Sequence, residues 1–155
     1  MPNWCDNSVK INGPIDKLYN MVKAVEQDQL LNHLVPIGDW DYNVANTEWG
    51  TKWDISEGDV TANEDYTELS ISFQTAWGPP TEAFETYMSL NNDVEITNWY
   101  YEGGNDFCGV NGEHRDNLPA YQDPVWDQDD VLKECDDMFG IRESMAMWDD
   151  EEEED

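Results

Sequence analysis

Alternating hydrophobic and polar positions predict several β-strands in this chain. The pattern is clearest between Tyr66 and Trp77, where apolar residues at every second position from Leu69 onward alternate with polar ones. A period of two places these two sets on opposite faces of a strand, so one face is buried and the other is in water. Weaker alternation predicts further strands over residues 4–11, 52–61 (interrupted at Gly58), 94–101 and 107–110.

Two segments carry the spacing of amphipathic helices. Apolar residues three and four positions apart begin at Ile15, directly after Gly13-Pro14, and predict a helix from Pro14 to about Asn32. Pro80 is placed to open a second helix, which the double asparagine at 91–92 ends. Residues 37–51 are rich in Asp and Asn and are predicted to form a loop.

The order of these elements indicates the fold class. It reads strand, helix, strand, strand, helix, strand, followed by one more hairpin strand. This order is typical of the α+β ferredoxin-like fold, the split βαβ arrangement (βαββαβ), in which two helices cover one face of an antiparallel sheet. We predict that this domain occupies residues 1–118.

The C-terminal part is predicted to be an acidic segment over residues 119–148. Within it, apolar residues at helical spacing between Val131 and Phe139 predict an amphipathic helix over about 128–139, which Gly140 ends. Three interpretations stay open: the helix packs on the domain, where it shields a sheet edge or the open face, it binds a partner, or the segment is disordered. Residues 149–155 are all acidic and are predicted to be disordered.

Net charge limits the classes of partner. The chain has 155 residues with 36 acidic and 7 basic side chains, and its formal net charge is -29. Residues 123–155 alone hold 15 of the acidic and 2 of the basic side chains, so they are about three times as charge-dense as the rest. Binding to nucleic-acid phosphates or to an anionic membrane needs Lys and Arg, so both are disfavoured. No apolar run is long enough to span a bilayer, and no secretory signal is visible.

Catalytic and metal-binding motifs are not found in the sequence. His33 and His114 lie on different predicted elements, and the three cysteines (Cys5, Cys108 and Cys135) form no CxxC pair. Cys108 has no assignable base and is interpreted as a buried structural thiol. We therefore predict a non-enzymatic protein without metal, cofactor or disulfides, in a reducing cytoplasm.

Tryptophan-containing motifs are the most distinctive local feature. The chain has eight Trp, and several of them lie at predicted strand ends or in the adjoining loops. They either pack as core in a small domain or form one aromatic cluster at a sheet end, where indoles line a pocket for a small ligand or a peptide. The candidate pocket residues are Trp49, Lys52, Trp53, Trp77, Trp99 and Glu102.

Four of these motifs carry a family resemblance. They are Met1-Pro-Asn-Trp-Cys-Asp-Asn7, Trp49-Gly-Thr-Lys-Trp53, Phe73-Gln-Thr-Ala-Trp77-Gly-Pro-Pro80 and Trp99-Tyr-Tyr-Glu-Gly-Gly-Asn-Asp-Phe-Cys-Gly109. Together they resemble the YubB-like family of phages, prophages and plasmids, over roughly residues 1–115. The resemblance implies a ferredoxin-like domain without an iron–sulfur cluster and an origin in a mobile element. It implies no activity, because the family is functionally uncharacterised.

Charge and family together lead to a functional hypothesis. We expect a phage or mobile-element protein of the host cytoplasm that binds a basic host or phage protein, with nucleic-acid mimicry as one version of this idea. The alternatives are a small-ligand or peptide-binding module at the tryptophan-rich end, or acidity that only reflects adaptation to salt. The carboxylates expected to contact a partner are those of the C-terminal segment: Asp127, Asp129, Asp130, Glu134, Asp136 and Asp137.

Overall fold

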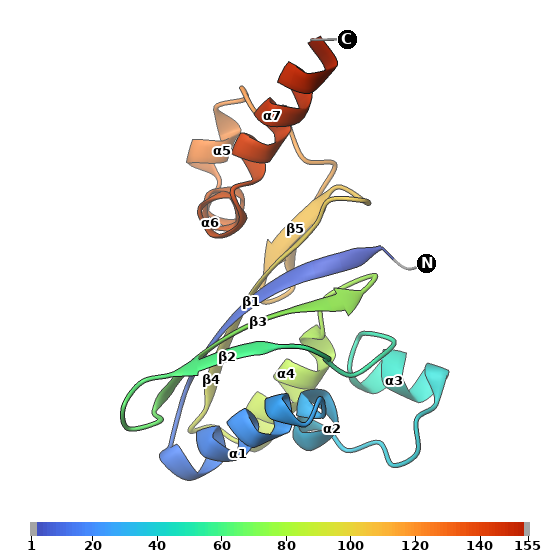
Figure 1. Cartoon of the computed structure of the whole chain (residues 1–155), viewed down its shortest axis with the longest axis vertical. Coiled ribbons are helices and arrows are strands. Elements are labelled where there is room, and N and C mark those ends of the chain that lie inside the picture. The colour runs from blue at the N-terminus through green and yellow to red at the C-terminus, as the bar shows by residue number, and fades with distance from the viewer. Residues whose placement is uncertain (1–2, 154–155) are drawn as a thin grey trace.

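A computed structural model describes residues 3–153 of the chain, with side chains as far as Met147. Its centre is a six-stranded sheet in the order β2-β3-β1-β4-β5-β6, in which each pair of neighbours is antiparallel. Helices lie on both sides of this sheet (Figure 1). The strands are β1 (Trp4–Asn12), β2 (Asp59–Ala62), β3 (Glu68–Ala76), β4 (Glu95–Glu102), β5 (Phe107–Val110) and β6 (Glu113–Asp116).

Strand β1 lies at the centre of the sheet and sets its register. Ile11 pairs with Leu69 of β3 on one side and with Ile96 of β4 on the other. The alternate residues of these three strands, from Cys5 and Val9 to Ile11 on β1, are buried on one face, as the sequence pattern predicts. We call this the inner face. The opposite, outer face carries the residues between them, which are mostly polar on β1 and β3 and include two aromatic residues on β4.

The inner face is covered by four helices. These are α1 (Ile15–Glu26), α2 (Leu30–Leu34), α3 (Tyr42–Glu48) and α4 (Thr81–Leu90). Leu18 and Met21 of α1 and Phe84 of α4 are buried against the sheet in the main core, together with Trp49, which follows α3. This layer gives the protein its ferredoxin-like α+β architecture.

Three predicted boundaries in this layer are wrong. The predicted helix over 14–32 is interrupted at Asp28, whose φ of 58° is left-handed, and α2 follows as a separate helix. The predicted loop 37–51 contains α3, which Asp41 caps by accepting a hydrogen bond from the Val44 N–H at 3.1 Å. The predicted strand over 52–61 is reduced to β2, because the Asp54 carboxylate accepts backbone N–H groups and holds residues 52–57 as a loop.

On the outer face, the C-terminal segment forms a second layer. It consists of α5 (Val125–Gln128), α6 (Asp130–Phe139) and α7 (Ile141–Glu153). Val131, Leu132 and Cys135 of α6 pack against Cys108 of β5 in a second core. Helix α6 therefore packs on the sheet, as in the first of the three interpretations of the sequence. Gly140, with a φ of 63°, ends α6 where the sequence predicts.

Helices α5 and α7 were not predicted. Helix α7 covers residues 141–153, so the structure describes part of the acidic run as helix. Residues 154–155 and the side chains from residue 148 onward lie outside the described part of the chain. The disorder expected for residues 149–155 stays a prediction.

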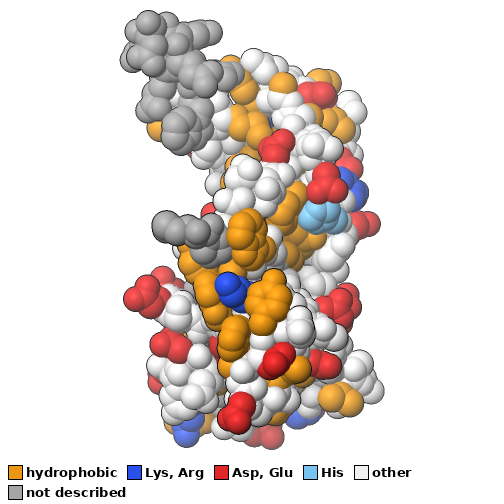
Figure 2. Space-filling view, turned by 90° about the vertical axis from the view of Figure 1, so that its right-hand side faces the viewer, with side chains coloured by type: hydrophobic (Ala, Val, Ile, Leu, Met, Phe, Trp, Pro, Cys, Tyr) orange, Lys and Arg blue, Asp and Glu red, His pale blue; other side chains and the backbone are white. Residues whose placement is uncertain are grey.

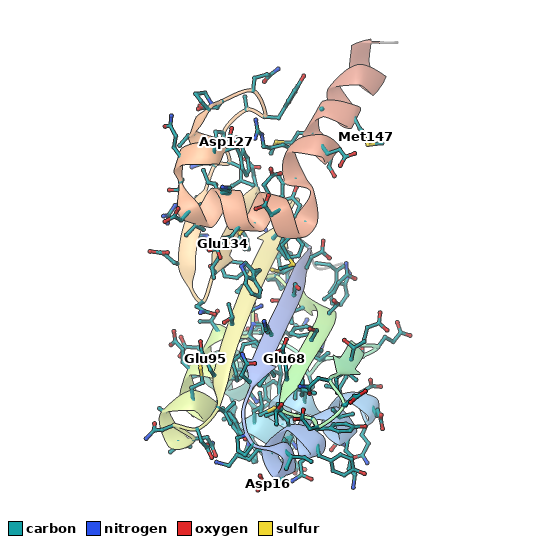
Figure 3. The ribbon with its side chains drawn as sticks, turned by 90° about the vertical axis from the view of Figure 1, so that its left-hand side faces the viewer. Asp16, Glu68, Glu95, Asp127, Glu134 and Met147 are labelled. Carbon is teal, nitrogen blue, oxygen red and sulfur yellow. The ribbon has the colours of Figure 1, made fainter. Side chains whose placement is uncertain are left out.

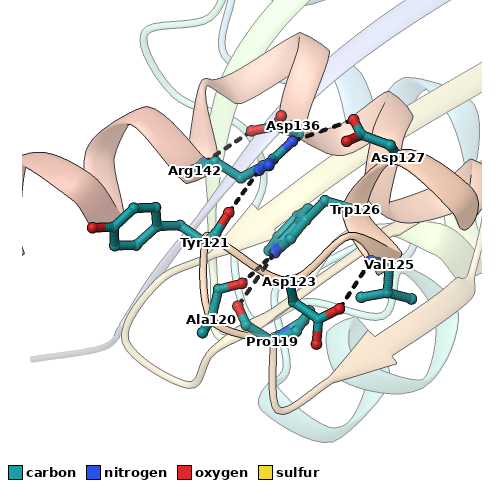
Figure 4. Close-up of polar contacts among 9 residues, drawn as sticks. All are labelled: Pro119, Ala120, Tyr121, Asp123, Val125, Trp126, Asp127, Asp136 and Arg142. Carbon is teal, nitrogen blue, oxygen red and sulfur yellow. Dashed lines mark hydrogen bonds and ion pairs between the residues drawn. The ribbon is translucent and has the colours of Figure 1, made fainter.

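Two side chains, one on α5 and one on α7, join these helices to the loop before them (Figure 4). The buried Trp126 donates its indole N–H to the carbonyls of Ala120 at 3.1 Å and Pro119 at 3.3 Å. Arg142 donates from its Nε to the Tyr121 carbonyl at 3.0 Å, and its Nη1 lies 3.3 Å from the Asp127 carboxylate. These contacts explain why the segment folds despite its charge.

Gly109 allows β5 to approach the Tyr100 ring. A Cβ at this position would collide with the Tyr100 hydroxyl and with the Glu113 carbonyl. We therefore expect Gly109→Ala to destabilise the fold by about 1–3 kcal/mol, the usual cost of overpacking. The matched control is Gly78→Ala, where a Cβ meets nothing within 4 Å. Urea denaturation of both variants checks this, and equal stabilities would contradict it.

The Asp129 carboxylate caps α6, and this predicts a dependence of stability on pH. The hydrogen bond from the Leu132 N–H, 2.9 Å long, lowers the pKa of Asp129, and Arg115 lowers it further. A lowered pKa means that the folded state prefers the charged form. The carboxylate therefore stabilises the fold above pH about 4, and this contribution is lost as the pH falls through the folded-state pKa.

Asp129→Asn keeps a capping acceptor but removes the titration. We expect the wild type to be more stable than this variant at pH 7 by about 0.5–1 kcal/mol, and the difference to shrink between pH about 5 and about 3. Asp137→Asn, which changes the net charge equally at an exposed position of α6, is the control. Urea denaturation over this pH range makes the measurement, and a difference that does not change with pH would sink the prediction.

Candidate functional site

The outer face of the sheet is covered over only part of its width. Helix α6 packs on β4, β5 and β6, while the outer faces of β1, β3 and β2 are left without a covering helix among residues 3–153. A groove of about 510 Å³ lies over this part of the sheet, beside the C-terminal end of α6. Its lining comprises Asp6, Asn7, Ser8, Ser56, Glu57, Asp59, Ser72, Phe73, Gln74, Met138 and Phe139.

Strand register sets the floor of the groove. Asp6 of β1 lies opposite Gln74 of β3, and Ser8 lies opposite Ser72. All four side chains project from the outer face, because their neighbours in sequence belong to the buried set. The Gln74 amide donates a hydrogen bond of 2.9 Å to the Asp6 carboxylate and fixes that carboxylate across the two strands.

Two further segments form the sides of the groove. On one side is the loop that leads into β2, with Ser56 and Glu57, followed by Asp59. The Asp28 carboxylate accepts the Glu57 N–H at 3.1 Å, and Glu57 itself has a left-handed φ of 56°. The other side is the end of α6, where the Phe139 ring lies 6.1 Å from the ring of Tyr101.

Every ionisable side chain in the lining of this groove is a carboxylate. Asp6, Glu57 and Asp59 contribute three negative charges, and neither Lys nor Arg belongs to the lining. Among the side chains that the structure describes, as far as Met147, no group of three or more His, Cys, Asp or Glu is arranged to hold a metal ion. The groove therefore favours an organic cation or a polar neutral group, with Met138 and Phe139 offering apolar contact.

A smaller cavity adjoins the groove. Its volume is about 230 Å³, it shares Ser56 and Gln74 with the groove, and Trp4 and Trp53 line its far side. Asp54 also belongs to its lining, and burial raises the pKa of this carboxyl group, although three backbone N–H groups oppose the shift. These hydrogen bonds make Asp54 part of the scaffold.

The candidate carboxylates of the C-terminal segment divide into two sets. Asp129 and Asp136 accept backbone N–H groups of α6 and of Arg142, and Asp127 pairs with the Arg142 guanidinium, so these three stabilise the segment. The others lie at helical spacing along the solvent side of α6 and are exposed. These are Asp130, Glu134 and Asp137.

The six candidate pocket residues are not all on one surface, and some of them pack as core, which is the other of the two interpretations of the sequence. Trp49 is buried in the main core, where its indole N–H donates to the Val35 carbonyl at 2.9 Å. Trp99 projects from the outer face of β4, because its neighbours Asn98 and Tyr100 are buried on the inner face. Glu102 is buried and accepts the Asn105 N–H in the turn after β4.

Only Lys52 and Trp53 of these six residues are brought together. The Lys52 ammonium lies 4.4 Å from the centre of a Trp53 ring, the distance of a cation–π contact. Trp77 is exposed after the end of β3, where its backbone N–H bonds to the Asn3 carbonyl. Trp49 and Glu102 are separated from this pair because they are buried, and Trp99 is separated from it because strand alternation places Trp99 on the outer face of β4.

Several other titratable groups are buried or hydrogen-bonded to one another. The Tyr100 hydroxyl lies 3.1 Å from His114 Nδ1, and His114 Nε2 lies 2.7 Å from an Asp116 oxygen. Burial raises the pKa of Tyr100 well above its ordinary value, so this hydroxyl keeps its proton. The three cysteines are free and buried, and burial raises the pKa of Cys5 to about 12.

Within residues 3–153, no helix has the length and apolar character needed to cross a membrane.

Sequence reasoning missed the groove itself. Its parts come from β1, from the loop before β2, from β3 and from the end of α6, and no local pattern links these segments. One signal was present, because the polar positions of the strand over 66–77 predict a wet outer face. The sequence does not indicate which strands α6 packs on, so it does not show that β1, β2 and β3 are left uncovered by α6.

Comparisons with known proteins identify the family. The family model described as "Ferredoxin-like domain in Api92-like protein" matches residues 48–153, and none of the curated proteins matches the chain. A similar solved structure is protein api92 from Yersinia pseudotuberculosis, which is 22% identical with a TM-score of 0.40. The match covers 60% of this chain and 34% of that one, so this chain spans about a third of the length of that relative. The chain belongs to the Api92-like family, to which it is related through a ferredoxin-like domain.

Proposed function

We propose that this protein is a non-enzymatic binding module that holds a basic segment of a partner protein in the groove between β1, β3 and α6. The observation that carries the proposal is the charge of the lining, where every ionisable side chain is a carboxylate. An Arg or Lys of a partner would form charge-assisted hydrogen bonds with Asp6, Glu57 or Asp59.

Apolar contacts and long-range electrostatic attraction also favour a basic segment in the groove. The aliphatic stems of Lys and Arg pack well on apolar side chains, and Met138 and Phe139 provide such a surface beside the carboxylates. A net charge of -29 also steers basic proteins toward the chain and speeds their encounter. The exposed carboxylates Asp130, Glu134 and Asp137 extend the acidic surface along α6.

Nucleic-acid mimicry is a narrower version of this proposal, and it needs carboxylates gathered on one face. Figure 3 labels Asp16, Glu68, Glu95, Asp127 and Glu134, which come from α1, β3, β4, α5 and α6 and span the length of the molecule. This spread is also what adaptation to salt would produce. We therefore base the proposal on the groove and not on the total charge.

The finer family assignment belongs to the proposal as well. We interpret β1 to β4 with their helices as the split βαβ unit, to which β5, β6 and the acidic helices are added. We also propose, from the resemblance to YubB-like proteins, an origin in a phage or another mobile element and a place of action in the host cytoplasm. The alternative function, a pocket for a small ligand, has less support, because Lys52 and Trp53 are the two of its six candidate residues that contact each other.

A basic peptide tests the groove directly. The probe is nona-arginine, and its affinity is measured by calorimetry at 150 mM salt for the wild type and for Glu57→Gln/Asp59→Asn. We expect the double variant to bind about tenfold more weakly, because two charge-assisted contacts in the groove are lost. A neutral peptide of equal length should not bind either protein.

The matched control is Asp16→Asn/Glu95→Gln, which removes the same number and types of carboxylate from exposed positions on α1 and β4. It should bind nona-arginine within about twofold of the wild type at this salt, where charges far from the site are screened. Equal weakening of both double variants would show that only total charge matters, and the groove would then be rejected as the site.

A further inference from the structure

A second surface of the molecule is rich in exposed aromatic side chains. Trp4, Trp40, Tyr42 and Trp53 have 43%, 52%, 55% and 39% of their area exposed. Figure 2 shows hydrophobic side chains gathered on this side of the protein, with a basic side chain among them. We call these four residues together with Lys52 the aromatic surface.

Direct contacts join the members of the aromatic surface. The Lys52 ammonium lies 4.4 Å from the Trp53 ring centre and 5.8 Å from that of Tyr42. The indole N–H of Trp40 donates to the Lys52 carbonyl at 2.9 Å. The rings of Trp4 and Trp53 lie 6.2 Å apart at an angle of 34° and flank the cavity of about 230 Å³. The surface is thus one connected patch with a recess at its edge.

A positive charge lies at the centre of this surface. Within the described residues, no carboxylate lies within 4.0 Å of the Lys52 ammonium, and the same holds for Lys23 and Lys133, whereas Lys10 and Lys17 are paired with Glu68 and Asp93. Aromatic faces hold Lys52 instead. A contiguous patch of large exposed aromatics on a soluble domain commonly marks an interaction site. An unpaired cation within it adds a requirement for a negative group.

We infer that the aromatic surface docks a partner segment that carries an Asp or Glu flanked by aromatic or aliphatic side chains. The carboxylate would pair with Lys52, and a neighbouring apolar side chain would enter the recess between Trp4 and Trp53. Charge complementarity favours an acidic segment over a basic one at this surface, because a basic segment would be repelled by the Lys52 ammonium. A basic segment is better placed in the groove, where all ionisable side chains are carboxylates. The inference goes beyond the proposed function, since it concerns a different surface and a different chemistry.

A second copy of the chain fits this surface poorly. In a two-fold symmetric dimer the same patch meets itself, so the two Lys52 ammonium groups would approach each other. Dimerisation through this surface is therefore an outcome that would overturn the inference.

Selection from a displayed library of random heptapeptides on the full-length protein tests the inference. We expect the selected peptides to carry Asp or Glu next to Trp, Phe or Leu. A synthetic copy of the most enriched peptide is then measured by calorimetry at 150 mM salt. Lys52→Met and Trp53→Ala should each weaken its binding by about tenfold or more, whereas Lys52→Arg should retain most of it.

The matched control is Lys23→Met, since Lys23 lies 4.6 Å from the Tyr19 ring in a similar cation–π contact on α1, away from the patch. This variant, and Glu57→Gln/Asp59→Asn in the groove, should bind the peptide as the wild type does. Near-ultraviolet circular dichroism confirms that each variant folds. Enrichment of basic peptides, an absence of enrichment, unchanged binding by Lys52→Met, or dimers that Trp53→Ala dissociates would each refute the inference.

Discussion

The way in which two helical layers share one sheet determines most of this structure. The inner face is covered from β2 to β4 by α1 and α4 with their companion helices, and within residues 3–153 the outer face is covered only over β4 to β6, by α6. Each layer buries its own apolar core, because a sheet face carrying alternate apolar residues must be removed from water. The outer side of β1 and β3 lacks such residues and remains bare, and the groove lies over it.

Charge follows from the same division. Carboxylates can be buried only at a large cost in desolvation, so nearly all of the acidic side chains must lie outside the two cores. With seven basic residues in the whole chain, few carboxylates can find a partner. Most of the charged surface of this protein is therefore acidic. What distinguishes this groove is its shape and the apolar side chains Met138 and Phe139 beside the carboxylates.

The sequence predicts the strands well where one physical signal dominates. Alternation located β1 and β3, and helical spacing located α4, α6 and the start of α1 to within a few residues. Where a side chain competes with the local pattern, the prediction failed. Asp54 accepts three backbone N–H groups and prevents a longer β2. Strand β6 was missed although Asn111-Gly112, both with positive φ, is a favoured hairpin turn.

The site was harder to predict because its residues come from separate elements. Phe139 fits the apolar stripe of α6 in the sequence, yet it also lines the groove with Asp6 from the other end of the chain. Tryptophans were grouped because they share motifs, but a motif does not reveal which face of a strand or helix a residue occupies. Trp49 is buried in the core, whereas Trp53, four residues further along the chain, is exposed on the surface.

One loop positions both proposed surfaces. Residues 52–57 place Lys52 and Trp53 on the aromatic side and Ser56 and Glu57 on the groove side. Asp54, at the middle of this loop, is fixed by N–H groups of α2, and the Glu57 N–H is fixed by Asp28. The left-handed Asp28 that interrupts the first helix is therefore also an anchor of the loop. Because both surfaces depend on the same anchors, the packing of α1 and α2 sets the placement of one surface relative to the other.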